Sequence, residues 1–300
     1  MDNKRFSENP FNPLILSSEE RAKLVALLDE MILAKFSEYE EYVHNEKKID
    51  LSRWKSFSRY GMTTTYLERK KSNSESKLLS SLMVGALPGT LDDNMFGLVS
   101  PTLEDMRIKA SYLHDFSAAA LLATIIEPSF DDPFRTVVVK WIEIDIPGAS
   151  TRLIHNRDYV FVEASGILCL KNGERVGYHI YHSVNFPQTP DLPHRVRGNM
   201  SFSCIFRQEN DRTDCRGTGF MDPGGDMIRT MAVMGMVQAT MAGSKYSYCG
   251  QMKKLTWLVE QNHKKEQVAH ASTSVYRALE LFVVHARSRK NSRLSQSSTN

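Results

Sequence analysis

The chain has 300 residues, of which 41% are hydrophobic and 24% are charged, the balance of an ordinary soluble globular protein. Its formal net charge of +3, from 38 basic and 35 acidic residues, is too near neutral to favour nucleic acid as the main partner. The four cysteines lie far apart without a CxxC pair, which excludes an encoded zinc finger and fits a reducing compartment better than a disulfide scaffold.

The start of the chain predicts an arm followed by a helix. Residues 1–16 carry Asn, Pro and Ser and are expected to form a flexible arm, and residues 1–13 are polar and lack the apolar core of a signal peptide. Ser17 and Glu20 have the spacing of a capping box, and apolar residues at helical spacing then continue to about His44. The longest uncharged apolar run, residues 116–126, is too short to span a bilayer, so we expect a cytoplasmic protein that could touch membranes from outside.

Strand patterns occupy most of the middle of the chain. They are runs of β-branched and aromatic residues bounded by Gly, Pro and Asn turn signals. The expected strands are residues 54–66 around Gly61, 78–87, 119–126, 134–144, 158–170, 175–184, 197–208 and 214–221. Two short helices are expected between the second and third strands, one beginning at Thr90 or Asp92 and one over residues 101–113.

The hydrophobic period changes after the turn Asp222-Pro223-Gly224-Gly225. Apolar residues then recur three or four apart, which predicts a helix with a possible break at Gly243. They are Met227, Met231, Met234, Val237 and Met241, with Leu255, Leu258 and Val259 in a continuation. Residues 275–285 predict a further short helix, and the Ser-rich basic residues 287–300 predict disorder. Segregated strands and helices favour an α+β fold.

Several stretches of the sequence resemble START domains, the steroidogenic acute regulatory protein-related lipid-transfer family. Arg157-Asp158-Tyr159-Val160 on an expected strand is similar to the family's RDF/RDY motif, and other stretches follow in the family's order. They are residues 177–183, the prolines at 187–193, Val196-Arg197-Gly198 and Asp222-Pro223-Gly224-Gly225. Further stretches are similar to oomycete START-like proteins, many of which carry a FYVE finger that we do not expect in this chain. They are residues 132–134, 140–141, 173–179 and 202–208.

The resemblance covers about residues 17–262 and implies a helix-grip fold. In that fold a curved antiparallel β-sheet surrounds a long C-terminal α-helix and encloses a hydrophobic cavity for one lipid or sterol. Residues 263–300 would follow as a helical and then disordered basic tail. The resemblance implies non-enzymatic lipid binding, with transfer or sensing, and neither catalytic residues nor a cofactor. It leaves the lipid and the oligomeric state open.

The expected lipid-binding residues follow from strand alternation and from the resemblance. Tyr159, Phe161 and Glu163 have the parity that places a charged residue in the pocket of sterol-binding relatives, which makes Glu163 the expected polar anchor. Its alternative position is a solvent-facing strand end near Gly166. The remaining candidates share a strand face or a helix face. They are Tyr178, Ile180 and His182; Met200, Phe202 and Cys204; and Met227, Met231 and Met234, which could equally be ordinary core.

Two other functions remain open. Relatives with this fold include cyclases and hydrolases, in which Tyr178, His182 and Glu163 could serve as acid or base. Large inward-facing side chains could instead fill the cavity and leave an interaction scaffold. His179 and His182 fall on opposite faces of a strand, so we expect no metal site there. The pair Arg157-Asp158 is expected to hold loops in place, and the basic tail could add affinity for anionic membranes.

Overall fold

The computed structural model describes residues 9–69, 78–113, 117–144 and 155–267. The chain divides into two compact units, Met1–Gln251 and Met252–Asn300. In the second unit, residues 252–267 are helical. The helix expected at residues 275–285 and the basic tail lie outside the described residues. Among the described helices, each is too short or too polar to cross a bilayer.

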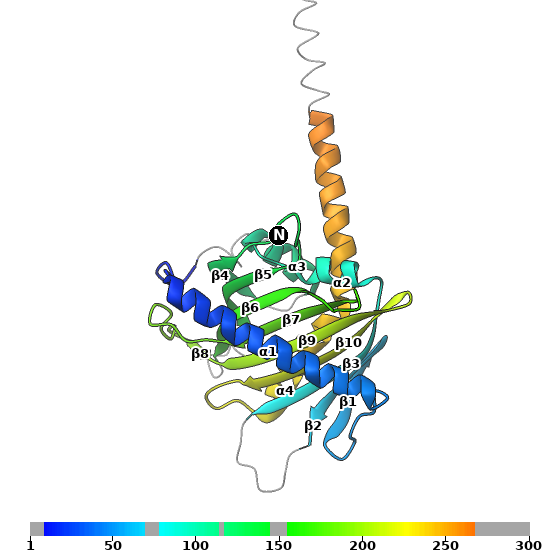
Figure 1. Cartoon of the computed structure of the whole chain (residues 1–300). Coiled ribbons are helices and arrows are strands. Elements are labelled where there is room, and N and C mark those ends of the chain that lie inside the picture. The colour runs from blue at the N-terminus through cyan, green and yellow to red at the C-terminus, as the bar shows by residue number, and fades with distance from the viewer. Residues whose placement is uncertain (1–8, 70–77, 114–116, 145–154, 268–300) are drawn as a thin grey trace, which may run out of the picture. The chain divides into compact units, whose positions relative to one another are not determined.

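The first unit is built on one curved sheet (Figure 1). Its strands, in the described residues, are β1 (Trp54–Tyr60), β2 (Met62–Glu68), β3 (Leu79–Pro88), β4 (Ala118–Ile126), β5 (Thr136–Ile144), β6 (Asn156–Cys169), β7 (Arg175–Ser183), β8 (Arg195–Arg197), β9 (Asn199–Glu209) and β10 (Arg212–Asp222). The order is β1-β2-β3-β10-β9-β7-β6-β5-β4, and every neighbouring pair in it is antiparallel. The short strand β8 pairs with β6 in parallel. The strand expected at residues 54–66 is a hairpin, because Gly61 turns the chain at a φ of 56°.

The first two helices begin at the capping residues that the sequence predicts. Ser17 and Glu20 form the expected capping box at the start of α1 (Ser18–His44). Thr90 and Asp93 form a second one at α2 (Leu91–Leu98). The remaining elements are α3 (Leu103–Leu113), α4 (Arg229–Ala242), the 3₁₀ turn η3 (Gly243–Lys245) and helical residues from 246 onward. The break expected at Gly243 is therefore this 3₁₀ turn.

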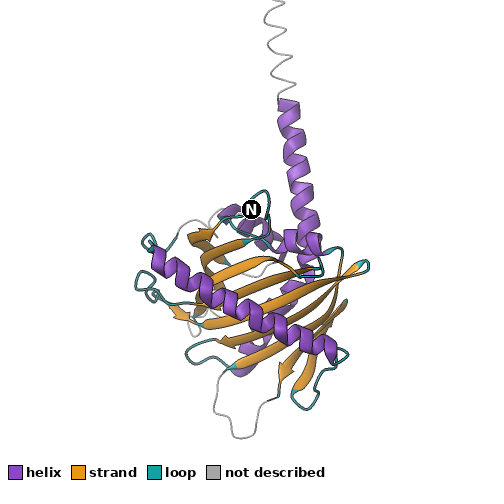
Figure 2. Cartoon of the chain, in the orientation of Figure 1, coloured by secondary structure: helices purple, strands orange, loops and turns teal. Residues whose placement is uncertain are grey.

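Helices α1 and α4 lie against opposite faces of the sheet (Figure 2). On the outer face, Leu28 and Ile32 of α1 join a core with Val160 and Ile180 of the sheet. On the inner face, Met236 of α4 packs with side chains of β6 and β9. This arrangement confirms the expected α+β helix-grip architecture, with a curved antiparallel sheet and a C-terminal helix on its inner side.

Residues 9–16 are more ordered than the expected flexible arm. Phe11, Leu14 and Leu16 are buried in the core beneath α1. The Phe11 ring meets Trp141 edge-on, with centroids 6.1 Å apart. Each of these side chains leaves water by packing on the outer face of the sheet. The prediction of a flexible arm gave weight to the Asn and Pro residues of the segment and overlooked its apolar ones.

The Arg157-Asp158 motif ties strands and loops together, and its two residues act separately because they point to opposite faces of β6, Asp158 to the outer one. The Asp158 carboxylate accepts hydrogen bonds from Trp141 Nε1 at 2.9 Å and Arg197 Nη2 at 2.8 Å. Arg157 instead donates from Nε to the backbone oxygen of Pro223 at 3.1 Å. The motif therefore fixes the ends of β6 and β8 and the turn before α4.

Candidate ligand cavity

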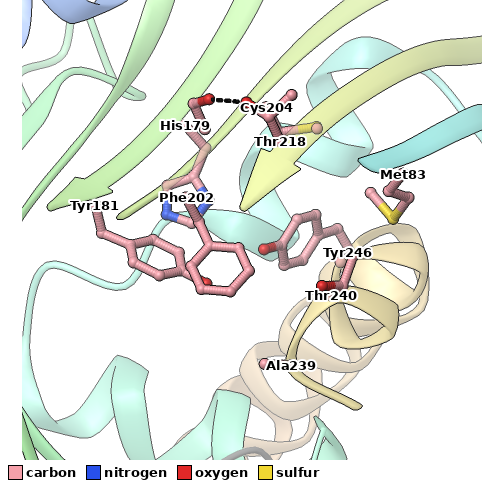
Figure 3. Close-up of a pocket in the computed structure, with 12 residues that line it drawn as sticks. Met83, His179, Tyr181, Phe202, Cys204, Thr218, Ala239, Thr240 and Tyr246 are labelled. Carbon is pink, nitrogen blue, oxygen red and sulfur yellow. Dashed lines mark hydrogen bonds between the residues drawn. The ribbon is translucent and has the colours of Figure 1, made fainter. Parts of the chain in front are cut away.

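Two adjoining cavities lie between the inner face of the sheet and the helices. The larger has a volume of about 80 Å³ and the smaller one of about 40 Å³. Side chains from β5, β6, β7, β9, β10, α3 and α4 line the larger one. His179, Tyr181, Ala239 and Tyr246 line both cavities. Figure 3 shows the smaller cavity, where the rings of Tyr181, Phe202 and Tyr246 face one another from the sheet and the C-terminal helix.

The larger cavity has an apolar body and a charged end. Its apolar walls are formed by aliphatic, thioether and aromatic side chains, namely Ile142, Ile144, Phe161, Met200 and Met221. Its polar end is formed by Ser100, Lys109, Lys140, Glu163 and His179. The four titratable groups in this set are each less than 9% exposed. Charged groups as deeply buried as these require partners of opposite charge or hydrogen-bond partners, because removing an ion from water is costly.

Glu163 on β6 is the centre of the polar end. Its Oε1 lies 2.7 Å from Nε2 of His179, and its Oε2 accepts a short hydrogen bond from Nζ of Lys140. Lys140 on β5 and His179 on β7 each lie diagonally across from Glu163 on a neighbouring strand, a position from which long side chains can meet on one face. Lys140 also donates to Ser100 Oγ at 3.1 Å. The sheet register therefore builds the cluster.

The electrostatics of the cluster favour an ionised carboxylate beside a neutral imidazole. Burial alone would raise the pKa of Glu163, but the Lys140 ammonium and the hydrogen bond from His179 together hold it well below its usual range. Burial lowers the pKa of His179, and Glu163 opposes that effect only in part. At neutral pH the imidazole is then neutral, and its Nε2 carries the proton donated to the carboxylate.

Lys109 of α3 completes the polar end from the opposite wall. Its Nζ donates to the backbone oxygen of Leu98 at 3.3 Å and lies 5.4 Å from the ring centroid of Tyr246. The Tyr246 ring also meets His179 edge-on at 6.1 Å. The Tyr246 ring thus contacts both the ammonium of Lys109 and the imidazole of His179.

The position of Tyr246 depends on a close approach between Gly97 of α2 and the helical residues 246–250. A Cβ at Gly97 would lie 1.8 Å from the Tyr246 backbone oxygen and 2.6 Å from the Gly250 nitrogen. We expect Gly97→Ala to lower the free energy of unfolding by about 1–3 kcal/mol, the usual cost of overpacking, when measured by urea denaturation.

A matched control is available in another helix. A Cβ at Gly235 of α4 meets nothing within 4 Å, so Gly235→Ala should be neutral or slightly stabilising. Equal stability of the two variants would contradict the close approach at Gly97.

The structure brings five of the residues expected from the sequence to the cavities. Phe161, Glu163 and Met200 line the larger one, and Phe202 and Cys204 line the smaller one. Tyr159 is buried on the same face and packs in the cluster that contains Phe161 and Met200, but it lines neither cavity.

The other expected residues lie elsewhere. Tyr178 and Ile180 pack in the core under α1 on the outer face, and His182 is half-buried on the same strand at the same parity. On α4, Met234 is 61% exposed and Met231 is half-buried, while Met227 precedes the helix and packs beside the inner cluster. The residues of α4 at the cavities are instead the small Ala239, Thr240 and Ala242.

Sequence reasoning missed Lys109, Lys140, His179, Tyr181 and Tyr246. One signal was readable for Lys140, since it interrupts the run of Val and Trp residues that forms β5. A single lysine in a strand buried on both sides must face either a carboxylate or a cavity. No comparable signal marks Lys109, whose helix has a mixed polar composition.

Comparison with known proteins gives only distant similarities. No protein-family model and no curated protein matches the chain. The chain is similar to the structure of human STARD10, with 13% identity over 74% of this chain and 86% of that one and a TM-score of 0.48. Human StAR-related lipid transfer protein 5 shares 16% identity over 73% and 98%, with a TM-score of 0.46. A STAR-related lipid transfer protein from Xanthomonas axonopodis shares 16% over 67% and 99%, with a TM-score of 0.48.

Similarities of this size carry no conclusion about the ligand. The fold and the cavity described above rest on the strands, helices and contacts of the chain itself.

Proposed function

We propose that the chain binds one amphiphilic molecule, a lipid or sterol, in the inner cavity and carries or senses it without changing it chemically. The observation that supports this function best is the division of the cavity into a buried apolar body and a buried charged end. Ligand sites are typically apolar hollows with a few polar groups that fix orientation. An amphiphile matches both parts, since its tail would lie along Ile142 and Met200 and its head would meet the polar cluster.

Binding of a lipid requires the cavity to widen. The two cavities are smaller than the roughly 150 Å³ void that accepts benzene in an engineered protein core. Helix α4 meets the space with small side chains and has no side-chain cap at its start. We therefore expect α4 to act as a lid that moves outward on loading. Delivery to or from a bilayer then implies peripheral membrane contact by the carrier.

Filling the apolar body should block uptake. We expect Met200→Trp to reduce lipid binding by about tenfold or more, because the larger ring occupies the space that the tail needs. The measurement is native mass spectrometry after incubation with a lipid panel presented from cyclodextrin, together with urea denaturation to show that the fold is kept.

Met234→Trp is the matched control, since Met234 is 61% exposed and the change adds the same ring. Retained uptake in this variant and lost uptake in Met200→Trp would support the proposal. Equal uptake by both variants would remove Met200 from the binding site.

A second function, acid–base catalysis, is favoured by one observation. His179 Nε2 lies 2.7 Å from Glu163 Oε1, and both residues border the cavity. A histidine hydrogen-bonded to a carboxylate in this way could act as a general base. Bound ligands should be extracted after long incubation and their molecular masses measured by mass spectrometry. An unchanged ligand mass supports the carrier function. A new product that forms with the parent chain but not with His179→Gln supports the enzyme.

A further inference from the structure

The charges at the polar end of the cavity do not cancel. Lys140 and Glu163 are in direct contact. The pair has a net charge of zero both as ammonium with carboxylate and as neutral amine with neutral acid. Burial lowers the pKa of His179, which leaves the imidazole neutral at neutral pH. The remaining ionisable group among the described residues of this end is the Lys109 ammonium, so these lining residues together carry one positive charge in excess.

Lys109 forms no direct salt bridge among the described residues, and the Glu163 carboxylate on which its charge acts is already in contact with Lys140. Its side chain is 7% exposed, and its hydrogen bond and ring contact go to the neutral groups Leu98 O and Tyr246. The nearby carboxylate of Asp105 accepts a hydrogen bond from Thr102 at the start of α3 and lines neither cavity. A buried ammonium without a direct ion-pair partner is costly, and the open side of this one is the cavity itself.

We infer that the bound amphiphile has a single anionic headgroup, a carboxylate or phosphate monoester, whose charge pairs with Lys109. This inference rests on the proposed function, because it names the class of ligand for the same cavity. The headgroup meets Lys109 from one side and the donors of Lys140 and Ser100 from the other. The hydrocarbon chain then extends along Ile144 and Met221. A neutral alcohol would leave the ammonium without a counter-charge.

The test compares ligands that share a tail and differ only in the headgroup. Hexadecanoic acid, monohexadecyl phosphate and hexadecanol, each presented from cyclodextrin, are titrated into the full chain at neutral pH by calorimetry. We expect at least one of the two acids to bind about tenfold or more tighter than the alcohol, since a hydrogen bond to a charged group contributes more than a neutral one. The tighter of the two acids identifies the headgroup.

Two variants locate the effect. Lys109→Met removes the ammonium and keeps the length of the side chain, so the preference for the acid should fall to about threefold or less while the alcohol still binds. Arg107→Met is the matched control, because it removes a positive charge from the same helix at a residue that lines neither cavity. It should keep the full preference.

The outcomes separate the two proposals. Failure of all three ligands to bind would count against the proposed function itself. Binding of hexadecanol as tight as that of both acids, or an acid preference that survives Lys109→Met, would overturn the inference about the headgroup and leave the lipid-binding function standing.

Discussion

Replacement of Glu163 by leucine is expected to lower the free energy of unfolding by about 3–5 kcal/mol, because it leaves the Lys140 ammonium buried without its carboxylate. Lys140 is 2% exposed and has only the Ser100 hydroxyl as its other hydrogen-bond partner in the described structure. His179 would also lose its acceptor. Urea denaturation at neutral pH measures the change.

A double variant shows whether the loss comes from the orphaned ammonium. Glu163→Leu combined with Lys140→Met removes both charges and should recover most of the lost stability, since an apolar pair of similar volume can replace a buried ion pair. Glu104→Leu is the control, because its side chain is 70% exposed and its change should stay within about 0.5 kcal/mol. If Glu163→Leu is as stable as Glu104→Leu, the cluster is not a buried ion pair.

The same cluster sets the sign of the pH dependence. The pKa of Glu163 is lowered on folding, so its contribution is present above its ordinary pKa of 4.5 and is lost as pH falls below that value. The pKa of His179 is also lowered, so the unfolded chain takes up its proton first as pH falls through 6.5. Both effects destabilise the fold on acidification. Glu163→Leu should therefore show a shallower loss of stability below pH 4.5.

Replacement of Asp158 by leucine should lower the free energy of unfolding as much as Glu163→Leu does, but through contacts on the outer face of the sheet. The Asp158 carboxylate is fully buried, and the substitution removes the acceptor for both Trp141 and Arg197. We expect a loss of about 3–5 kcal/mol, because an arginine is left without its carboxylate in a buried setting. Asp211→Leu, at a side chain 85% exposed, should stay within about 0.5 kcal/mol.

Ligand uptake separates the two buried carboxylates. Asp158 lies on the face that α1 covers and lines neither cavity, so the folded fraction of Asp158→Leu should bind lipid as the parent chain does. Glu163 lines the larger cavity, so its replacement should change the affinity or the selectivity of the folded protein. A specific loss of uptake in Asp158→Leu would contradict a purely structural role for the motif.

The positions of strands and helices were predictable because their signals are local. Turn glycines such as Gly61 and Gly173 require positive φ, and the cap residues Ser17 and Thr90 satisfy free amides at helix starts. The strand order was not predictable from the sequence pattern, since pairings such as β3 with β10 join residues far apart in the chain. The resemblance implied a curved antiparallel sheet around a C-terminal helix but no strand order, which the structure supplies.

The facing of site residues was predictable on some elements and not on others. On β6, Glu163 is a charged residue in an apolar run, and the structure places it in the cavity. On β7, both faces are buried, so alternation does not distinguish His179 and Tyr181 at the cavity from Tyr178 and Ile180 under α1.

Helix α4 was harder to orient for a related reason. It is apolar on more than one side, so the spacing of its methionines does not identify the side that meets the sheet. The side that does so carries Ala232, Met236 and Ala239, while Met234 faces solvent. Lys109 could not be assigned from its own helix, because its role depends on β5 and β6 across the cavity.

The most direct test of the central claim is native mass spectrometry of the purified chain, followed by solvent extraction and identification of any bound molecule. We expect one amphiphile per chain, with an acidic headgroup and a long apolar tail, and its loss from Met200→Trp but not from Met234→Trp. A chain that arrives empty and takes up none of a broad lipid panel would contradict the lipid-binding function.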